Sequence, residues 1–239
     1  MIANTITTAN TISPDIAGSR SSRTSSIEMR RTLRRAALLL LAAAPYLPAG
    51  EVWSWHAVDL TVLKSSRAEV VLHGRLRTGR DFTTAQQGRT GVISRFAMPR
   101  RVSLIGGYYY GREEDSAEDW RNLHRVFGGL ETLVYRTGGI AVDTRGLVER
   151  FFVPDRAQFT RYRHRFRLGT QKPLGPYLSS EWFFDADGYL SSRNGAGLRW
   201  RFSRAATVEF GYLYDARRST VGEPRHVVVT QFRIDPFLR

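Results

Sequence analysis

The sequence of 239 residues contains no cysteine. This absence excludes disulfide bonds, thiol catalysis and cysteine-based metal sites in the chain. It also removes the residue that anchors lipoproteins, so we do not expect a lipid-modified cysteine. Structure and function must therefore come from other side chains.

Long hydrophobic runs are also scarce. The longest, residues 36–44, is much shorter than the ~20 apolar residues that a membrane-spanning helix needs. It follows Met29 and a segment with four arginines, and it precedes the small residues Ala49 and Gly50. This order is typical of a secretory signal peptide, and we expect cleavage near Ala49.

The chain therefore divides into three segments. Residues 1–28 are polar and are expected to be an upstream extension, from a start codon assigned too early, or an unfolded segment. Residues 29–50 are the predicted signal peptide. Residues 51–239 contain no apparent linker or internal repeat, so we expect a single domain.

Recognisable catalytic and ligand-binding motifs are missing as well. None of the five histidines lies in a nucleophile motif, the acidic segment 113–119 lacks the spacing of a calcium loop, and there is no glycine-rich phosphate loop. His73 shares a predicted strand face with arginines, and the other histidines fall on an apolar face or near strand ends. We therefore expect no catalytic residue, no metal and no cofactor.

Acidic residues are few relative to basic ones, which gives the chain a net charge of +14. The first fifty residues hold six arginines and two acidic residues, so the remainder keeps a net charge of +10. Such a surplus indicates nucleic acid, an anionic membrane or an anionic ligand as a partner. The placement of the arginines must decide between them.

Apolar residues after position 50 recur mostly at every second position, which is the period of a β-strand. We predict an all-β domain with strands at 53–63, 69–78, 90–98, 102–111, 123–136, 140–152, 158–170, 176–185, 193–203, 207–217 and 225–235.

The predicted connections alternate in length. Short turns are expected at 64–67, 99–101, 137–139, 171–175 and 203–205, and longer loops near 79–88, 112–120, 154–157, 185–192 and 218–224. This alternation is typical of an antiparallel up-and-down transmembrane β-barrel. Bacterial barrels normally have an even number of strands. The count of eleven therefore suggests that one strand is split or merged, or that the N-terminal segment is not a full spanning strand, and we expect about ten to twelve strands.

Arginines follow the strand period most clearly in residues 161–168. Successive side chains of a strand point to opposite faces, so four arginines share one face and Tyr162, His164, Phe166 and Leu168 share the other. A charge facing lipid costs about 2–4 kcal/mol at the midplane, so the charged face belongs inside the barrel. We predict that the interior is lined by Arg75, Arg77, Arg145, Glu149, Arg161, Arg163, Arg165, Arg167, Glu181, Arg193, Arg199, Arg201 and Glu209.

Several arginines in one interior need counterions or water. Glu131, Glu149, Glu181, Glu209 and Asp59 are the candidate ion-pair partners. The resulting network could simply fill a small barrel, or it could select anions. Aromatic residues near strand ends, including Tyr108 to Tyr110, are expected to form interfacial girdles.

Seven short motifs lie along the predicted strands and turns: WSW at 53–55, LIGGYY at 104–109, NLHR at 122–125, GLVERF at 146–151, YRHRFR at 162–167, PYLSSEWF at 176–183 and FGYLY at 210–214. On these motifs the chain resembles an uncharacterised domain-of-unknown-function family of small outer-membrane β-barrels from Gram-negative bacteria. The resemblance implies a fold and a location but no ligand or catalytic residue. The end of the chain departs from the usual terminal aromatic residue of such barrels, since Arg239 follows Phe237.

These observations favour a non-enzymatic outer-membrane barrel, either structural or a narrow channel that prefers anions. Its expected partners are outer-membrane lipid, lipopolysaccharide and the barrel assembly machinery, with no nucleic acid. The oligomeric state stays open. Two alternatives are a barrel enzyme acting on lipid or peptide, with His124 or His226 at the rim, and a soluble anion-binding β-protein.

Overall fold

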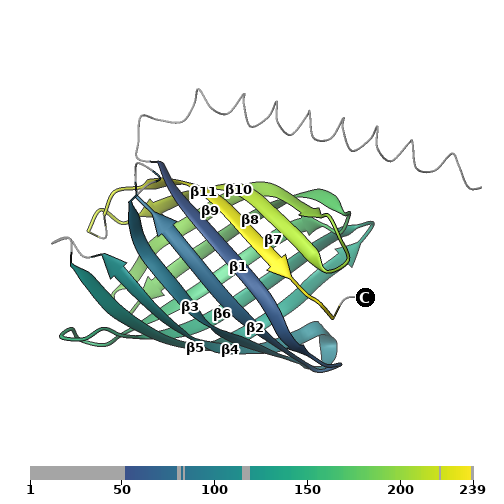
Figure 1. Ribbon diagram of the computed structural model, residues 1–239, viewed down its shortest axis with the longest axis horizontal. Helices are drawn as coiled ribbons and strands as arrows, with labels where there is room; N and C mark the ends of the chain where they lie inside the picture. The colour runs from purple at the N-terminus through teal and green to yellow at the C-terminus, as the bar shows by residue number, and fades with distance from the viewer. Residues whose placement is uncertain (1–51, 80–81, 83, 115–118, 221, 238–239) are drawn as a thin grey trace, which may run out of the picture. The chain divides into compact units, whose positions relative to one another are not determined.

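The computed structural model describes residues 52–79, 82, 84–114, 119–220 and 222–237, which form a closed β-barrel (Figure 1). The predicted signal peptide and the extension before it lie outside these residues. The strands are β1 (Val52–Lys64), β2 (Ala68–Thr78), β3 (Ala85–Ala97), β4 (Val102–Glu114), β5 (Trp120–Thr137), β6 (Ile140–Phe152), β7 (Phe159–Thr170), β8 (Leu174–Asp185), β9 (Gly188–Arg201), β10 (Ala206–Arg217) and β11 (Arg225–Ile234). A short 3-10 helix, η2 (Pro99–Arg101), precedes β4. In the described ranges, no helix has the length and apolarity to cross a membrane.

The strands follow one another around the barrel in chain order. Each consecutive pair is antiparallel, whereas β1 and β11 close the barrel as a parallel pair, with Val52 opposite His226 and Leu60 opposite Ile234. The prediction of an all-β barrel with about ten to twelve strands is confirmed. The expectation that the count of eleven reflects a miscounted strand is wrong, and the pairing is not antiparallel throughout. An odd number of alternating strands necessarily brings the first and last strands together in the same direction (Figure 1).

Most strand boundaries agree with the predicted ranges to within a few residues, and the main departures lie at loop-like sequences. Both β3, beginning at Ala85, and β9, beginning at Gly188, start five residues earlier than predicted. A tight turn of two residues joins β8 to β9, where a longer loop was expected at 185–192. The early part of β3 contains Gln86, Gln87 and Gly88, and that of β9 contains Gly188, Ser191 and Ser192, so an apolar strand pattern does not detect them.

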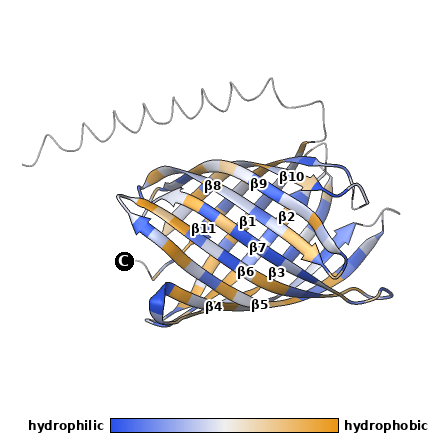
Figure 2. Ribbon diagram, turned by 180° about the vertical axis from the view of Figure 1, so that it is seen from behind, coloured by the Kyte–Doolittle hydropathy of each residue, from blue (hydrophilic) through white to orange (hydrophobic). Residues whose placement is uncertain are grey.

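Apolar and polar residues alternate along the strands, as Figure 2 shows by hydropathy. Every strand carries at least one large hydrophobic side chain that is exposed on the outside of the barrel, such as Leu72 on β2, Val126 on β5 and Leu178 on β8. Their chain neighbours Val71 and Arg125 point inward and are buried. Because alternate residues of a strand face opposite sides, the barrel has an apolar outer surface and a mixed interior.

Glycines make room for aromatic side chains in that interior. A Cβ atom at Gly107 would lie 2.6 Å from Cζ of Phe127, and one at Gly211 would lie 2.5 Å from the Tyr177 hydroxyl. Phe127 stacks on Tyr109 with ring centroids 5.0 Å apart. Tyr109 is therefore a buried interior residue, and its predicted place in an outer aromatic girdle is wrong. Three consecutive tyrosines of one strand cannot all face outward.

Candidate functional site in the barrel interior

Three cavities follow one another inside the barrel. The loop-end cavity, about 370 Å³, is lined by residues from β2 to β10 and opens where the β2–β3, β4–β5 and β6–β7 connections lie. A middle cavity of about 170 Å³ shares Arg75, Arg89 and Tyr109 with it. A turn-end cavity of about 250 Å³ shares Arg95, Arg145 and Arg233 with the middle one. Side chains from strands on all sides of the barrel meet only in its interior, so the three cavities divide a single lumen.

Cationic side chains outnumber anionic ones in each cavity. Nine arginines and two glutamates line the loop-end cavity. Six arginines face two carboxylates in the middle cavity, and six face four in the turn-end cavity. The positive excess is therefore largest at the loop end and smallest at the turn end.

Glu149 lies at the centre of an ion-pair network and is 1% exposed. Its carboxylate accepts from Arg161 Nη2 at 2.6 Å and from Arg125 Nη1 at 3.1 Å, and Arg163 Nη1 lies 3.5 Å away. These residues come from β5, β6 and β7. Opposite residues in the strand register, such as Glu149 and Arg161, share the inward face and can meet in this way.

Glu181 on β8 extends this network. It accepts two hydrogen bonds from Arg163, at 2.5 and 2.9 Å, and Arg145 Nη2 lies 3.5 Å from its carboxylate. The bidentate geometry is the strongest that a guanidinium and a carboxylate can form. Together, Glu149 and Glu181 fix Arg163 on both sides and fill the centre of the barrel.

The remaining predicted interior residues fall into two groups. Arg165 pairs with Asp143 at 2.8 Å, Arg167 with Glu209 at 2.7 Å, and Arg193 with Asp215 at 3.1 Å. In contrast, Arg199 donates to the carbonyl oxygen of Thr170, and Arg201 is exposed at the last residue of β9, outside the three cavities. The structure thus places Arg201 at the barrel end, although it shares the face of Arg199.

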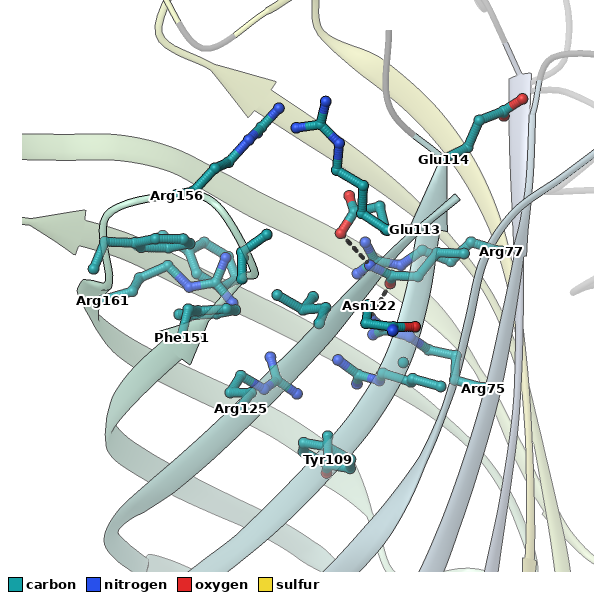
Figure 3. A pocket seen from close by; sticks show the side chains of 18 of the residues that line it. Arg75, Arg77, Tyr109, Glu113, Glu114, Asn122, Arg125, Phe151, Arg156 and Arg161 are labelled. Carbon is teal, nitrogen blue, oxygen red and sulfur yellow. Dashed lines mark hydrogen bonds between the residues drawn. The ribbon is translucent and has the colours of Figure 1, made fainter. Parts of the chain in front are cut away.

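Arg75, Arg77 and Arg89 differ from the arginines just described. Among the described residues, no carboxylate lies within ion-pair distance of any of the three, although all three line the loop-end cavity. Arg75 donates to Gln87 Oε1 at 3.1 Å, and Gln87 in turn donates to Glu113 at 2.8 Å. Figure 3 shows this relay, with Arg75, Arg77, Arg125 and Arg161 around the cavity.

Aromatic rings take the place of counterions for these arginines. The guanidinium carbons of Arg77, Arg193 and Arg75 lie 4.0, 4.7 and 5.6 Å from the Trp55 ring centroid. Arg89 and Arg125 lie 4.6 and 4.4 Å from the Tyr109 ring. Arg77 and Arg193 over Trp55, and Arg89 and Arg125 over Tyr109, are at most about 9 Å apart, so each pair of like charges repels by at least roughly 2 kcal/mol at an effective dielectric constant of about 20. Cation–π contacts offset about that amount when desolvated, so the cluster stays short of negative charge.

A buried Asp59–His73 pair lies between the loop-end and turn-end cavities. His73 Nδ1 is 2.7 Å from Asp59 Oδ1, and Gln231 donates to Asp59 Oδ2 at 2.7 Å. Asp59 thereby connects β1 to both β2 and β11 across the parallel seam. Arg89 lies 3.5 Å from the other ring nitrogen of His73. Within the described ranges, no cluster of three or more histidine or acidic residues could hold a metal ion.

Several interior residues escape the sequence prediction. Arg89 precedes the predicted strand at 90–98, and Arg125 shares its face with Phe127, so neither belongs to an obvious arginine row. Asp215 follows the aromatic Tyr214 and is completely buried. Continuing the predicted strand through its polar end would have placed Arg89 in the interior, because Arg89 shares a strand face with Gly91 and Ile93.

Comparison with known proteins gives a single informative result. A family model described as a protein of unknown function (DUF2490) matches residues 52–224, which include β1 to β10. No curated protein matches the chain.

Proposed function

Because the chain belongs to the DUF2490 family of proteins of unknown function, we propose a function from the barrel itself: a narrow, anion-preferring pathway in the bacterial outer membrane. The arginine excess in all three cavities is the observation on which the proposal rests. Rings of cationic side chains favour anions in narrow pores.

The outer surface supports a membrane location. Large exposed hydrophobic side chains occur on all eleven strands, so apolar surface surrounds the barrel. Soluble monomers rarely expose a contiguous apolar patch of more than a few hundred Å². Lipid is the environment that such a surface favours, and a closed barrel leaves no unpaired strand edge in it. Lipopolysaccharide and the barrel assembly machinery follow as proposed partners.

The centre of the lumen limits what could pass. The Glu149 and Glu181 networks separate the cavities, together with the buried Tyr109, Phe127 and Phe183. A filled interior is common in small barrels, and it supports a structural barrel as the second candidate function. The two candidates differ in whether small anions cross.

We also propose that the barrel is not an enzyme. Of the five histidines, His73 is the one in a buried pair with a carboxylate, which is the arrangement of a catalytic base. Its other ring nitrogen faces Arg89 at 3.5 Å, where a nucleophile would have to lie.

Reversal potentials in planar bilayers test the proposed pathway. With a KCl gradient, the wild-type protein should give small conductances and a reversal potential of the sign set by chloride. The triple variant R75Q/R77Q/R89Q should lose most of this preference, because it removes three of the nine arginines of the loop-end cavity. Arg150→Gln is the matched control, since Arg150 points outward and contacts Thr160 and Gln158.

A cation preference, or equal selectivity in the triple variant and the wild type, would contradict the pathway. Absence of conductance would favour the structural barrel instead, provided that protease protection after reconstitution into lipid vesicles shows that the protein inserts.

A further inference from the structure

We propose that the loop-end cavity is a binding site for a small soluble molecule that carries phosphoryl groups. The proposal rests on the proposed function in one respect: the cavity must open to an aqueous compartment. The site consists of Arg75, Arg77 and Arg89, with Arg125 and Arg193 beside them.

Unused hydrogen-bond donors are the first observation. Buried atoms that lack a partner among the described residues include Nε of Arg75, Arg77 and Arg89, Nη2 of Arg125 and Nε1 of Trp55. All five are N–H donors. Buried polar groups are nearly always paired, so these unpaired donors belong to guanidinium groups, and to one indole, whose hydrogen bonding within the described residues is incomplete. The Arg75, Arg77, Arg89 and Arg125 side chains line the loop-end cavity, where a ligand rich in oxygen acceptors would meet them.

The arrangement of the guanidinium groups is the second observation. Arg75 and Arg89 face each other in the register of β2 and β3. Arg77 and Arg193 lie over Trp55, and Arg125 lies with Arg89 over Tyr109. The cationic groups therefore come together from β2, β3, β5 and β9 around one cavity rather than along one strand.

Phosphoryl chemistry fits this arrangement better than a halide or a carboxylate does. Each guanidinium is a planar fork that matches two oxygens of a phosphoryl group. A carboxylate has only two oxygens and one charge, so it can satisfy a small part of the cluster. A phosphoryl group presents at least three oxygens and up to two charges near neutral pH, and two linked groups could reach arginines over both rings.

Two carboxylates and an aromatic pair complete the lining of the loop-end cavity. Glu113 and Glu114 line the cavity, and Glu113 reaches Arg75 only through Gln87. Gln87 thereby holds Arg75 in place without neutralising it. On the opposite side, the Phe151 and Phe159 rings are stacked 4.4 Å apart and provide an apolar wall.

Calorimetric titration of the purified barrel in zwitterionic detergent tests the site, with inorganic pyrophosphate as the probe. At constant ionic strength, pyrophosphate should bind at least tenfold more tightly than acetate, with sulfate between them. R75Q/R77Q should weaken pyrophosphate binding at least tenfold, and Arg150→Gln should leave it unchanged. Arg89→Lys keeps the charge but loses the fork, so it should weaken binding by a smaller factor.

A urea titration of the same variants separates a binding role from a structural one. Arginines without a carboxylate partner among the described residues repel one another, so R75Q/R77Q should unfold at a urea concentration equal to or above that of the wild type. Pyrophosphate should raise the midpoint of the wild type alone. If these arginines stabilise the fold instead, R75Q/R77Q will unfold earlier and the site is refuted.

The outcomes are distinguishable from those for the pathway. Pyrophosphate binding without conductance would refute the pathway and leave the site standing. Anion-selective conductance with equal affinity for pyrophosphate and acetate would refute the site and leave the pathway. Equal losses in R75Q/R77Q and Arg150→Gln would also overturn the site.

Discussion

Replacing Glu149 by glutamine should destabilise the barrel strongly, because the buried Glu149 carboxylate pairs with three arginines. It is 1% exposed and lies 2.6, 3.1 and 3.5 Å from nitrogens of Arg161, Arg125 and Arg163. Glutamine keeps the size of the side chain and one acceptor oxygen but removes the charge. Three arginines would then remain together without their shared counterion.

The size of the effect follows from the burial. Each arginine–carboxylate contact at about 4 Å between charge centres is worth roughly 4 kcal/mol before desolvation, at an effective dielectric constant of about 20. Desolvation cancels much of this, and breaking a buried pair by removing one partner typically costs about 3–5 kcal/mol. We expect about 3 kcal/mol for Glu149→Gln, since one acceptor is retained.

Urea unfolding, followed by the boiling-dependent mobility shift of folded barrels on gels, provides the assay. With a slope of about 2 kcal/mol per molar urea, the midpoint should fall by about 1.5 M. Glu69→Gln is the control, because Glu69 pairs with Arg95 at 2.9 Å but the two side chains are 28% and 21% exposed. It should cost less than about 1 kcal/mol. If the two variants differ by less than about 0.5 kcal/mol, the interior network does not stabilise the barrel as described.

Three further predictions concern the outer face, the packing and the seam. Leu130→Arg, on the outer face near the middle of β5, should cost about 2–4 kcal/mol in lipid vesicles, whereas a water-exposed site would lose less than about 0.5 kcal/mol. Gly107→Val should cost at least about 1–3 kcal/mol, because its Cβ would clash with the Val92 carbonyl oxygen and lie 2.6 Å from Phe127 Cζ, whereas Gly74→Val, with no atom within 4 Å of its Cβ position, should be nearly neutral in the same unfolding assay. Asp59→Asn should cost about 1–3 kcal/mol and speed amide hydrogen exchange in β1 and β11 before other strands; uniform exchange across the barrel would show that the seam is not a separate unit.

Alternation of side chains makes the strands and their two faces readable from the sequence. In residues 161–168, parity alone separates the four arginines from Tyr162 and Phe166, and the structure has the arginines in the interior and these two rings exposed outside. The pattern is local, because the order of residues within one strand determines which of its side chains share a face. The number of strands follows from the same local pattern, whereas their order around the barrel is predicted by the up-and-down alternation of turns and loops.

Other features depend on parts of the chain that are far apart. Asp59 and Gln231 meet across the parallel seam although 172 positions separate them, and no local pattern predicts that pairing. Parity also cannot tell which face is inside when both faces are aromatic, as in the strand with Tyr108, Tyr109 and Tyr110. Of the arginines around Trp55 and Tyr109, the sequence predicts Arg75, Arg77 and Arg193 but not Arg89 and Arg125. Arg125 shares its face with Phe127 rather than with other arginines.

The absence of cysteine allows a direct test of the central claim, that one strand face meets lipid and the other lines an aqueous lumen. Leu178 and Ser179 are neighbours on β8, and Leu178 is 56% exposed on the outside whereas Ser179 opposes the interior residue Arg167. Single-cysteine variants at these two positions should react differently with a small charged thiosulfonate in lipid vesicles. The account predicts fast reaction at position 179, and at position 178 slow reaction in vesicles that becomes fast after unfolding. Equal, fast reaction at both positions in the folded protein would contradict it.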